Sequence, residues 1–206
     1  MADYIRVLRR IGRVKGFSPS RDKEISENIS LCLDGNSNGL EFMIYDLEGF
    51  IKERAEELDS ESKELKAQAK KSEGLLRAEV RLVKSNAIRA CTERLVASEQ
   101  ITELCSKVQE IFLDVFQWVV PLGRFYKKDE AVGIVCKKIT DAKTRRRMLN
   151  LITLVTEKKS LLLAQKALSH RRIGEVMAAF EYVEVSPITI GKRHDVKQLD
   201  SIYKFM

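Results

Sequence analysis

Apolar residues recur at alternating steps of three and four through the middle of the chain, the spacing of a helix with one buried stripe. Between Leu40 and Val120 the chain contains no proline. The clearest register consists of Ser98, Ile101, Cys105, Val108, Phe112, Val115 and Val119. The same spacing precedes it at Leu76, Val80, Val83, Ala87 and Cys91. The pattern predicts a long helix that packs in an intramolecular bundle or forms a homodimeric coiled coil.

The length of this stretch limits how it can be arranged. A continuous helix of about 80 residues would span about 120 Å, so the helix either projects from the body or folds back on itself. Asp and Ser favour helix caps at 59–62, and Gly74 weakens a helix interior. We favour a fold-back at 59–62. Pro121 and Gly123 are expected to end the helical run.

The flanking segments also read as helices. Residues 4–14 predict a basic amphipathic helix, and the spacing of Ile25, Ile29 and Cys32 or Leu33 predicts a second, short one. Residues 129–139 and 140–168 predict two further helices. The longer of these is expected to be central to the core through Met148, Leu149, Leu151, Ile152, Leu154 and Val155.

The pattern changes near the C-terminus. Residues 180–192 alternate around Pro187, which predicts a small hairpin or a pair of short edge strands. Residues 196–206 return to helical spacing, as a docking tail or a partner-binding segment would.

Together these elements predict a mainly α protein, a helical bundle with a long coiled-coil-like helix or helical hairpin and a small β element near the C-terminus. Three prolines and ten glycines among 206 residues agree with few turns. The regions are 1–39, with the basic helix and the short helix; 40–120, the long helical region; 121–180, a basic helical core; and 181–206, the β element and tail. We expect them to form one folded unit.

Residues 33–41, LDGNSNGLE, resemble the start of a calcium loop. Asp34, Asn36, Asn38 and Gly39 occupy the first four required positions. Position 12 is Tyr45, so the bidentate carboxylate is absent. We instead expect a turn in which Asn38 caps the following helix, and we expect no metal.

The residues that mark enzyme sites are sparse. The two histidines, His170 and His194, stand beside no nucleophile or metal partner in the sequence, and there is no glycine-rich phosphate loop. The four cysteines lack the paired spacing of a zinc site. The sequence therefore predicts a protein that is not an enzyme and needs no cofactor.

The charge is unevenly distributed and indicates an anionic partner. Residues 40–75 have a net charge of −4, with ten acids and six bases, whereas residues 120–172 have +10, with fourteen bases and four acids. We expect helices to gather the basic side chains into a band that binds the backbone of RNA or DNA, largely without regard to sequence. The candidate contacts are Lys137, Lys138, Lys143, Arg145, Arg146, Arg147, Lys158, Lys159, Arg171 and Arg172.

Two alternatives stay open. The N-terminal helix could instead bind an anionic membrane, as a peripheral or matrix-like scaffold, through Arg6, Arg9, Arg10 and Arg13. A protein–protein adaptor whose charge only maintains solubility is the other.

We also expect self-association through Ile101, Val108, Phe112 and Val115. Without an apolar leader or membrane span, the expected location is intracellular, either cytoplasmic or nuclear.

Overall fold

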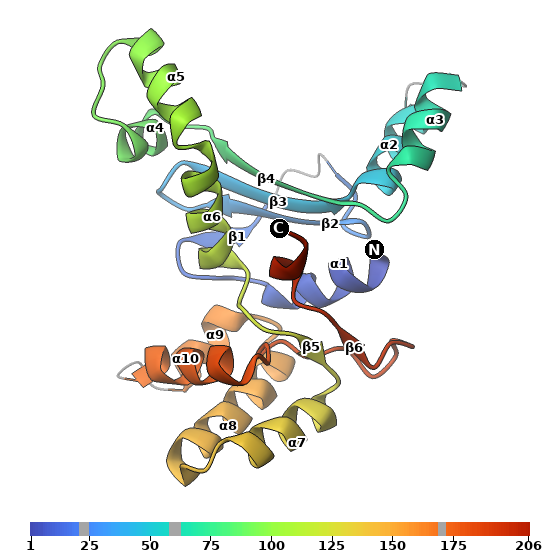
Figure 1. The fold of residues 1–206 in the computed structure, drawn as a ribbon, viewed down its shortest axis with the longest axis vertical. Coiled ribbons are helices and arrows are strands. Elements are labelled where there is room, and N and C mark those ends of the chain that lie inside the picture. Colours follow the sequence, from blue (N-terminus) through green and yellow to red (C-terminus); the bar gives the residue numbers. More distant parts are fainter. Residues whose placement is uncertain (21–24, 58–62, 169–171) are drawn as a thin grey trace. The chain divides into compact units, whose positions relative to one another are not determined.

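A four-stranded antiparallel sheet forms much of the N-terminal half, where the sequence pattern predicts helices (Figure 1). The computed structural model describes residues 1–20, 25–57, 63–168 and 172–206. The chain divides into two compact units. Unit 1 comprises Met1–Ile5 and Gly16–Phe116, and unit 2 comprises Arg6–Lys15 and Gln117–Met206. The prediction of a mainly α bundle is therefore wrong, and the protein has a mixed α/β fold.

The sheet of unit 1 has its strands in chain order. They are β1 (Phe17–Pro19), β2 (Ser30–Gly35), β3 (Leu40–Asp46) and β4 (Leu76–Leu82). In the centre, Phe42 of β3 lies opposite Leu33 of β2 and Val80 of β4. The side chain of Phe42 is fully buried, as is that of Leu33.

The sequence contains local signals for these strands, but some of their apolar positions also fit the spacing of a helix. In β4 the apolar residues Leu76, Ala78, Val80 and Leu82 alternate with charged ones, which is the period of a strand. The helical assignment rested on Leu76, Val80 and Val83, of which Leu76 and Val80 fit both periods. In β3 the residues from Phe42 to Tyr45 are buried without interruption. A strand covered on both faces shows no alternation, so its type is ambiguous in the sequence.

The glycine-rich stretch that resembles a calcium loop is the connection of a β-hairpin. It joins β2 to β3, and Asn38 Oδ1 accepts a hydrogen bond from the backbone N–H of Leu40 at 3.0 Å. The backbone of Gly39 has a φ of 69°, which glycine adopts without strain. The predicted capping of a helix by Asn38 is therefore wrong, because strand β3 follows it. The predicted short helix at 25–33 is also wrong, because β2 begins at Ser30.

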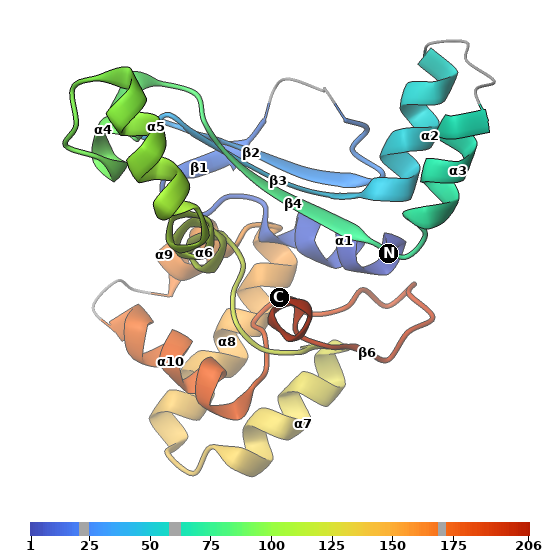
Figure 2. The ribbon, with the colours of Figure 1, turned by 45° about the horizontal axis from the view of Figure 1, so that its top comes forward.

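The helices of unit 1 are short. They are α2 (Leu47–Glu57), α3 (Lys63–Lys71), α4 (Ser85–Cys91), α5 (Ala97–Ser106) and the first part of α6 (Val108–Val119). Helices α2 and α3 lie side by side beyond one end of the sheet, and α4 and α5 lie beyond the other (Figures 1 and 2). The rings of Phe116 in α6 and Phe42 in β3 meet edge to face, with centroids 5.8 Å apart.

The predicted continuous helix and its coiled coil are thus wrong. Strand β4 and three separate helices occupy residues 76–119. The predicted fold-back at 59–62 lies outside the described residues. Helix α6 ends at Val119, just before Pro121, as predicted.

Unit 2 contains most of the remaining helices. Helix α1 (Ala2–Leu8) leads into the 3-10 helix η1 (Arg9–Ile11), and the C-terminal half supplies α7 (Lys128–Lys138), α8 (Ala142–Lys158), α9 (Leu161–Ala167) and α10 (Ile173–Val183). Met148, Leu151, Ile152 and Val155 of α8 are buried, which confirms its predicted place in the core. The predicted helix 140–168 is interrupted at Lys159, whose left-handed backbone (φ 49°) ends α8.

The C-terminal β element lies elsewhere than predicted. Residues up to Val183 belong to α10, since Val176, Phe180 and Val183 form its buried face at helical spacing. Strand β6 (Gln198–Leu199) pairs instead with β5 (Phe125–Tyr126). The tail ends in η3 (Ile202–Phe205), where the hydroxyl of Tyr203 donates to the carbonyl of Val120 at 2.6 Å. In the described part of the chain, no helix is both long and apolar enough to cross a bilayer.

One face of the sheet bears a polar cluster centred on Glu79. The hydroxyl of Tyr45 donates to Glu79 Oε1 at 2.6 Å, and Glu79 also contacts Arg77 at 2.8 Å and Arg81 at 3.4 Å. Burial, and then this hydrogen bond, raise the pKa of Tyr45 to about 12. Burial raises the pKa of Glu79, but the bond from Tyr45 and the two arginines outweigh it, so that this pKa is lowered overall.

We expect the free energy of unfolding to fall as pH rises from about 10 to 12. A raised pKa means that folding favours the protonated phenol, so its contribution is complete below the ordinary pKa of 10.0 and is lost as pH passes through about 12. Urea unfolding followed by circular dichroism across this range measures the loss. Because the pKa of Tyr203 is also raised, the difference between wild type and Tyr45→Phe isolates the effect. A difference that is constant with pH would contradict it.

Candidate anion-binding surface of unit 2

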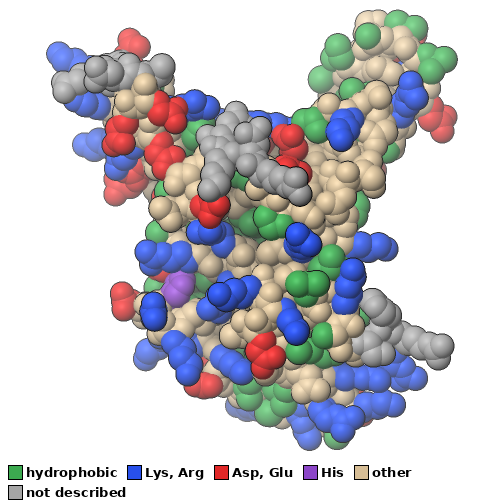
Figure 3. Space-filling view, turned by 180° about the vertical axis from the view of Figure 1, so that it is seen from behind, with side chains coloured by type: hydrophobic (Ala, Val, Ile, Leu, Met, Phe, Trp, Pro, Cys, Tyr) green, Lys and Arg blue, Asp and Glu red, His purple; other side chains and the backbone are tan. Residues whose placement is uncertain are grey.

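The two units have opposite net charges. Unit 2 contains 23 Lys and Arg residues and nine Asp and Glu residues, a net charge of +14, while unit 1 contains 14 and 21, a net charge of −7. Lys and Arg side chains accordingly gather over the surface formed by unit 2, with few acidic side chains among them (Figure 3). Anions are therefore attracted to unit 2 and repelled by unit 1.

A first group of cations lies where α7 ends and α8 begins. We call it the α7–α8 cluster: Lys137, Lys138, Lys143, Arg145, Arg146 and Arg147. Asp141 caps α8 by accepting a hydrogen bond from the N–H of Thr144 at 2.7 Å. The side chain of Thr144, and then this backbone hydrogen bond, lower the pKa of Asp141. The cap fixes the first turn of α8, so the cationic side chains start from an ordered backbone.

The members of this cluster are not equally available. Lys137, Lys143 and Arg146 are exposed. Arg145 instead donates from Nη1 to the carbonyl of Ile139 at 3.1 Å, and Lys138 Nζ lies 3.4 Å from the carbonyl of Val183. These two side chains help to hold the ends of α7 and α10, so Lys137, Lys143 and Arg146 are the better placed to face a ligand.

The remaining predicted contacts lie apart from this cluster. Lys158 ends α8 and Lys159 follows it, 12 and 13 positions after Arg146, which corresponds to about 20 Å along the helix. Arg172 precedes α10 and contacts Glu175 at 3.9 Å. Arg171 lies outside the described residues. The sequence predicts one band, and the structure distributes its cations over both ends of α8.

The C-terminal end of α8 lies against the segment that contains the N-terminal arginines. The hydroxyl of Ser160 donates to the carbonyl of Arg13 at 3.3 Å, and the N–H of Leu162 donates to the same carbonyl at 2.9 Å. Gly12 has a φ of 58°, and a Cβ there would lie 2.3 Å from the carbonyl oxygen of Lys159. Only glycine permits this approach, because it has no Cβ. As a result, η1 packs against the C-terminal end of α8.

Beside this contact between η1 and α8 lies a basic cavity of ≈ 280 Å³, which we call the η1 cavity. It is lined by Arg6, Arg9, Arg10, Val155, Thr156 and Lys159. Four of the six are cations and none is an acid. Arg6, Arg9 and Arg10 belong to the set that the sequence suggested for membrane contact, and Lys159 to the nucleic-acid set. The structure brings the two sets together.

Arg10 is the most enclosed of these cations. It is half-buried and donates from Nη1 to the carbonyl of Thr189 at 2.7 Å. Burial lowers the pKa of Arg10, which means that the surroundings disfavour its positive charge. A neutral carbonyl compensates that charge only in part, so an anion in the cavity would stabilise it.

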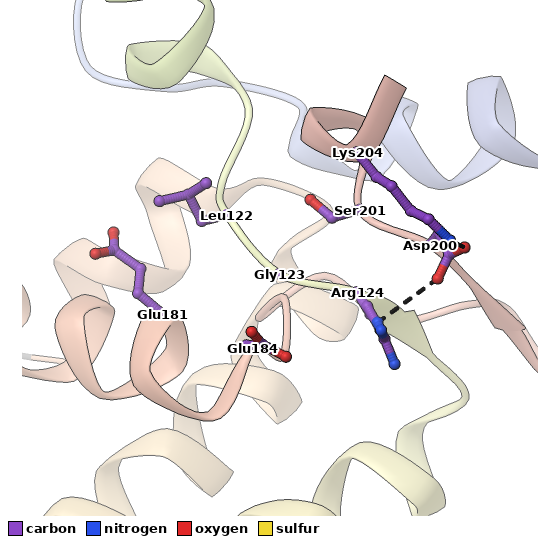
Figure 4. A pocket seen from close by; sticks show the side chains of 8 residues that line it. All are labelled: Leu122, Gly123, Arg124, Glu181, Glu184, Asp200, Ser201 and Lys204. Atoms are coloured by element: carbon purple, nitrogen blue, oxygen red, sulfur yellow. Dashed lines mark hydrogen bonds and ion pairs between the residues drawn. The ribbon is translucent and has the colours of Figure 1, made fainter. Parts of the chain in front are cut away.

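A second cavity in unit 2, of ≈ 340 Å³, has a different character. It lies between the end of α10, the segment before β5 and the C-terminal tail (Figure 4). Arg124 and Lys204 both reach Asp200, at 3.6 and 2.7 Å. Its cations are therefore paired within the site, and Glu181 and Glu184 add negative charge. It offers no net attraction for an anion.

The residues predicted to mediate self-association divide into two pairs. Val115 is buried, and the half-buried Phe112 packs against Phe116 with ring centroids 5.6 Å apart. Ile101 in α5 and Val108 at the start of α6 are 61% and 65% exposed. The second pair is therefore the better placed to contact another molecule.

Sequence reasoning missed that Arg6, Arg9 and Arg10 share a cavity with Lys159, about 150 positions away. Gly12 within the arginine-rich segment and Ser160 after α8 are the local signals of this junction. Neither identifies the other without the fold.

No family model, curated protein or solved structure matches this chain. We therefore infer its function from the geometry of the described residues.

Proposed function

We propose that the protein binds nucleic acid, without catalysis, through the backbone phosphates that unit 2 attracts. The observation that carries this proposal is the net charge of +14 on unit 2, displayed at both ends of α8. A duplex has one phosphate charge per about 1.7 Å of its axis, so a path of about 20 Å presents about twelve. The α7–α8 cluster and the end of α8 are far enough apart to contact phosphates along such a path.

Backbone contact fits the composition of this surface better than base reading does. The segment 137–147, which carries the α7–α8 cluster, contains no aromatic residue on which an unpaired base could stack. Lys and Arg near phosphates give affinity and orientation, but they give little sequence preference. The protein is therefore expected to bind RNA and DNA of many sequences.

The experiment is a titration of a short labelled duplex at several salt concentrations. The logarithm of the association constant should fall linearly with the logarithm of salt concentration, at about 0.9 per phosphate neutralised. Binding that does not change with salt would overturn the proposal.

The burial of the N-terminal helix favours nucleic acid over membrane insertion as the partner. Ile5, Val7, Leu8 and Ile11 are fully buried. Insertion of an amphipathic helix into a bilayer requires an exposed apolar face. The N-terminal arginines remain at the surface of the η1 cavity, where they can contact a soluble anion.

We also propose that unit 1 mediates self-association. Leu95, Val96, Ile101 and Val108 are 93%, 56%, 61% and 65% exposed and lie close together in sequence, on and around α5. A second copy of the same chain would remove this apolar surface from water, which is favourable by about 25 cal/mol per Å². Self-association would also place two basic units on one nucleic acid and raise the apparent affinity.

Replacing both Ile101 and Val108 by Lys should therefore reduce the mass in solution to that of a monomer. Charges at the centre of an apolar contact are buried without partners and oppose association. Light scattering coupled to size exclusion measures the mass. Leu163→Lys with Tyr182→Lys, at exposed apolar positions of unit 2, is the matched control and should leave it unchanged. Equal masses for all three proteins would contradict the proposal.

A further inference from the structure

The segment that joins α4 to α5 presents two adjacent apolar side chains to solvent. We call this segment, residues 92–96, the α4–α5 loop. Leu95 is 93% exposed and Val96 is 56% exposed. A single exposed apolar residue is ordinary on a protein surface, but two together at the tip of a loop form a small protruding apolar surface.

Hydrogen bonds to α5 fix the backbone on which these side chains stand. The hydroxyl of the buried Thr92 donates to Glu103 Oε2 at 2.5 Å and accepts from the N–H of Arg94 at 3.1 Å. The side-chain amide of Gln100 donates to the carbonyl of Arg94 at 2.7 Å. The residue before Leu95 is therefore held in place. Less conformational entropy is lost when a partner binds such a loop than when it binds a mobile one.

Unit 1 also contains a groove of ≈ 290 Å³ between α2 and α3, which we call the α2–α3 groove. Its apolar lining consists of Ile51, Ala55, Leu65 and Ala69. Ala69 is buried and the other three are half-buried. A cavity of about 150 Å³ holds one benzene molecule, so this groove has room for two aliphatic side chains.

The α4–α5 loop and the α2–α3 groove lie at opposite ends of the same sheet (Figures 1 and 2). Helices α2 and α3 adjoin the end where Asp46 of β3 pairs with Leu76 of β4. Helix α4 follows the other end of β4, where Leu82 pairs with Leu40. Seven residues of β4 separate these ends by about 20 Å. Within one molecule the loop therefore cannot fill the groove.

We propose that the α4–α5 loop of one copy docks in the α2–α3 groove of a second copy, where Leu95 and Val96 contact its apolar lining. This inference rests on the self-association proposed above, and it names the surface that receives the exposed residues. Contact between two α4–α5 loops is the alternative. A protruding side chain loses more of its surface to a groove than to another protrusion, so docking in the groove buries more apolar area.

The charges of the two surfaces agree with this pairing. Residues 92–106 contain three acids and one base, a net charge of −2, whereas α3 contains four lysines and one glutamate, a net charge of +3. Helix α2 contains four acids and two bases, a net charge of −2. The acidic side chains beside the loop should therefore face the α3 side of the groove, where Lys66 and Lys70 line it. Two loops facing each other would bring like charges together, which opposes association.

The test removes one half of the contact at a time. Leu95→Lys with Val96→Lys replaces the apolar side chains of the loop, and Ala55→Lys fills the groove. Each variant alone should have the mass of a monomer by light scattering under conditions where wild type self-associates. An equimolar mixture should have the mass of a dimer, because the intact loop of the groove variant can dock in the intact groove of the loop variant.

Two further variants control for the effect of a new lysine. Ala67→Lys is the matched control, because Ala67 is exposed on α3 and does not line the groove. It should self-associate as wild type does. Ala55→Gln is a smaller change within the groove and should weaken self-association about tenfold, since it leaves an amide without partners in the contact. Lys and Gln are nearly as favourable in a helix as Ala, so these variants should keep α2 and α3.

The outcomes separate this inference from the one on which it rests. If both Ala55 variants self-associate as wild type does, or if the equimolar mixture stays monomeric, the loop does not dock in the groove, although self-association still stands. Loss of self-association in Ala67→Lys would also overturn the inference, because the groove would not be the determinant. A monomeric wild type would remove both self-association and this inference, and the binding of nucleic acid by unit 2 would be unaffected.

Discussion

Replacing Lys137, Lys143 and Arg146 by Gln should flatten the salt dependence of duplex binding by about 2.7 units of slope, at about 0.9 for each lost phosphate contact. The three side chains are exposed members of the α7–α8 cluster. They are better targets than Arg145, whose bond to the carbonyl of Ile139 helps to fix the end of α7. Between about 50 and 200 mM salt, the gap in affinity from wild type should narrow about 40-fold.

The control removes the same charge from the other unit. Lys63, Lys70 and Lys71 are exposed on α3 in unit 1, and replacing them by Gln should leave the slope as in wild type. Fluorescence anisotropy with one labelled duplex measures all three proteins. If both triple variants flatten the slope equally, binding follows the total charge of the chain, and the α7–α8 cluster is not the contact surface.

The fold shows which features of this sequence determine structure locally and which do not. Helix α8 was predictable because Met148, Leu151, Ile152 and Val155 recur on one face and Asp141 supplies a cap. Strand β4 was not, because Leu76 and Val80 fit both a helix and a strand. The decisive evidence was the alternation of Arg77, Glu79 and Arg81 with the apolar residues, together with a pairing strand 30 to 42 positions earlier.

The hairpin between β2 and β3 shows the same ambiguity at a turn. Asp34-Gly35 and Asn38-Gly39 between two apolar runs are typical of a β-hairpin, yet the same letters fit a calcium loop and a helix cap. The apolar runs on both sides show that the turn belongs to a hairpin, since β2 and β3 pair along five residues from Ser30 to Asp34. Local polar motifs identify a turn more reliably than they identify what the turn connects.

The candidate site was predictable in its residue types and not in its grouping. The cations of 137–147 are adjacent in sequence, and they remain together at the junction of α7 and α8. Arg6, Arg9 and Arg10 were assigned to a separate partner because their distance from Lys159 in the sequence hides their distance in the fold. The close approach of Gly12 to Lys159 brings them together, and it depends on tertiary packing.

Replacing Gly12 by Ala should destabilise unit 2 by about 2 to 4 kcal/mol. The left-handed backbone (φ 58°) costs a residue with a Cβ about 1 kcal/mol, and crowding in a packed interior costs about 1 to 3 more. The new Cβ would lie 2.3 Å from the carbonyl oxygen of Lys159 and 3.0 Å from the Cα of Ser160, both backbone atoms that cannot rotate away. The melting temperature should fall by about 2 to 4 °C per kcal/mol.

The same substitution at Gly133 provides the opposite expectation. Gly133 lies within α7, and a Cβ there meets nothing within 4 Å. Alanine favours a helix interior over glycine by about 1 kcal/mol, so Gly133→Ala should raise the melting temperature. If Gly12→Ala melts as wild type does, η1 does not sit against the end of α8 in solution, and the cavity that depends on that contact is absent.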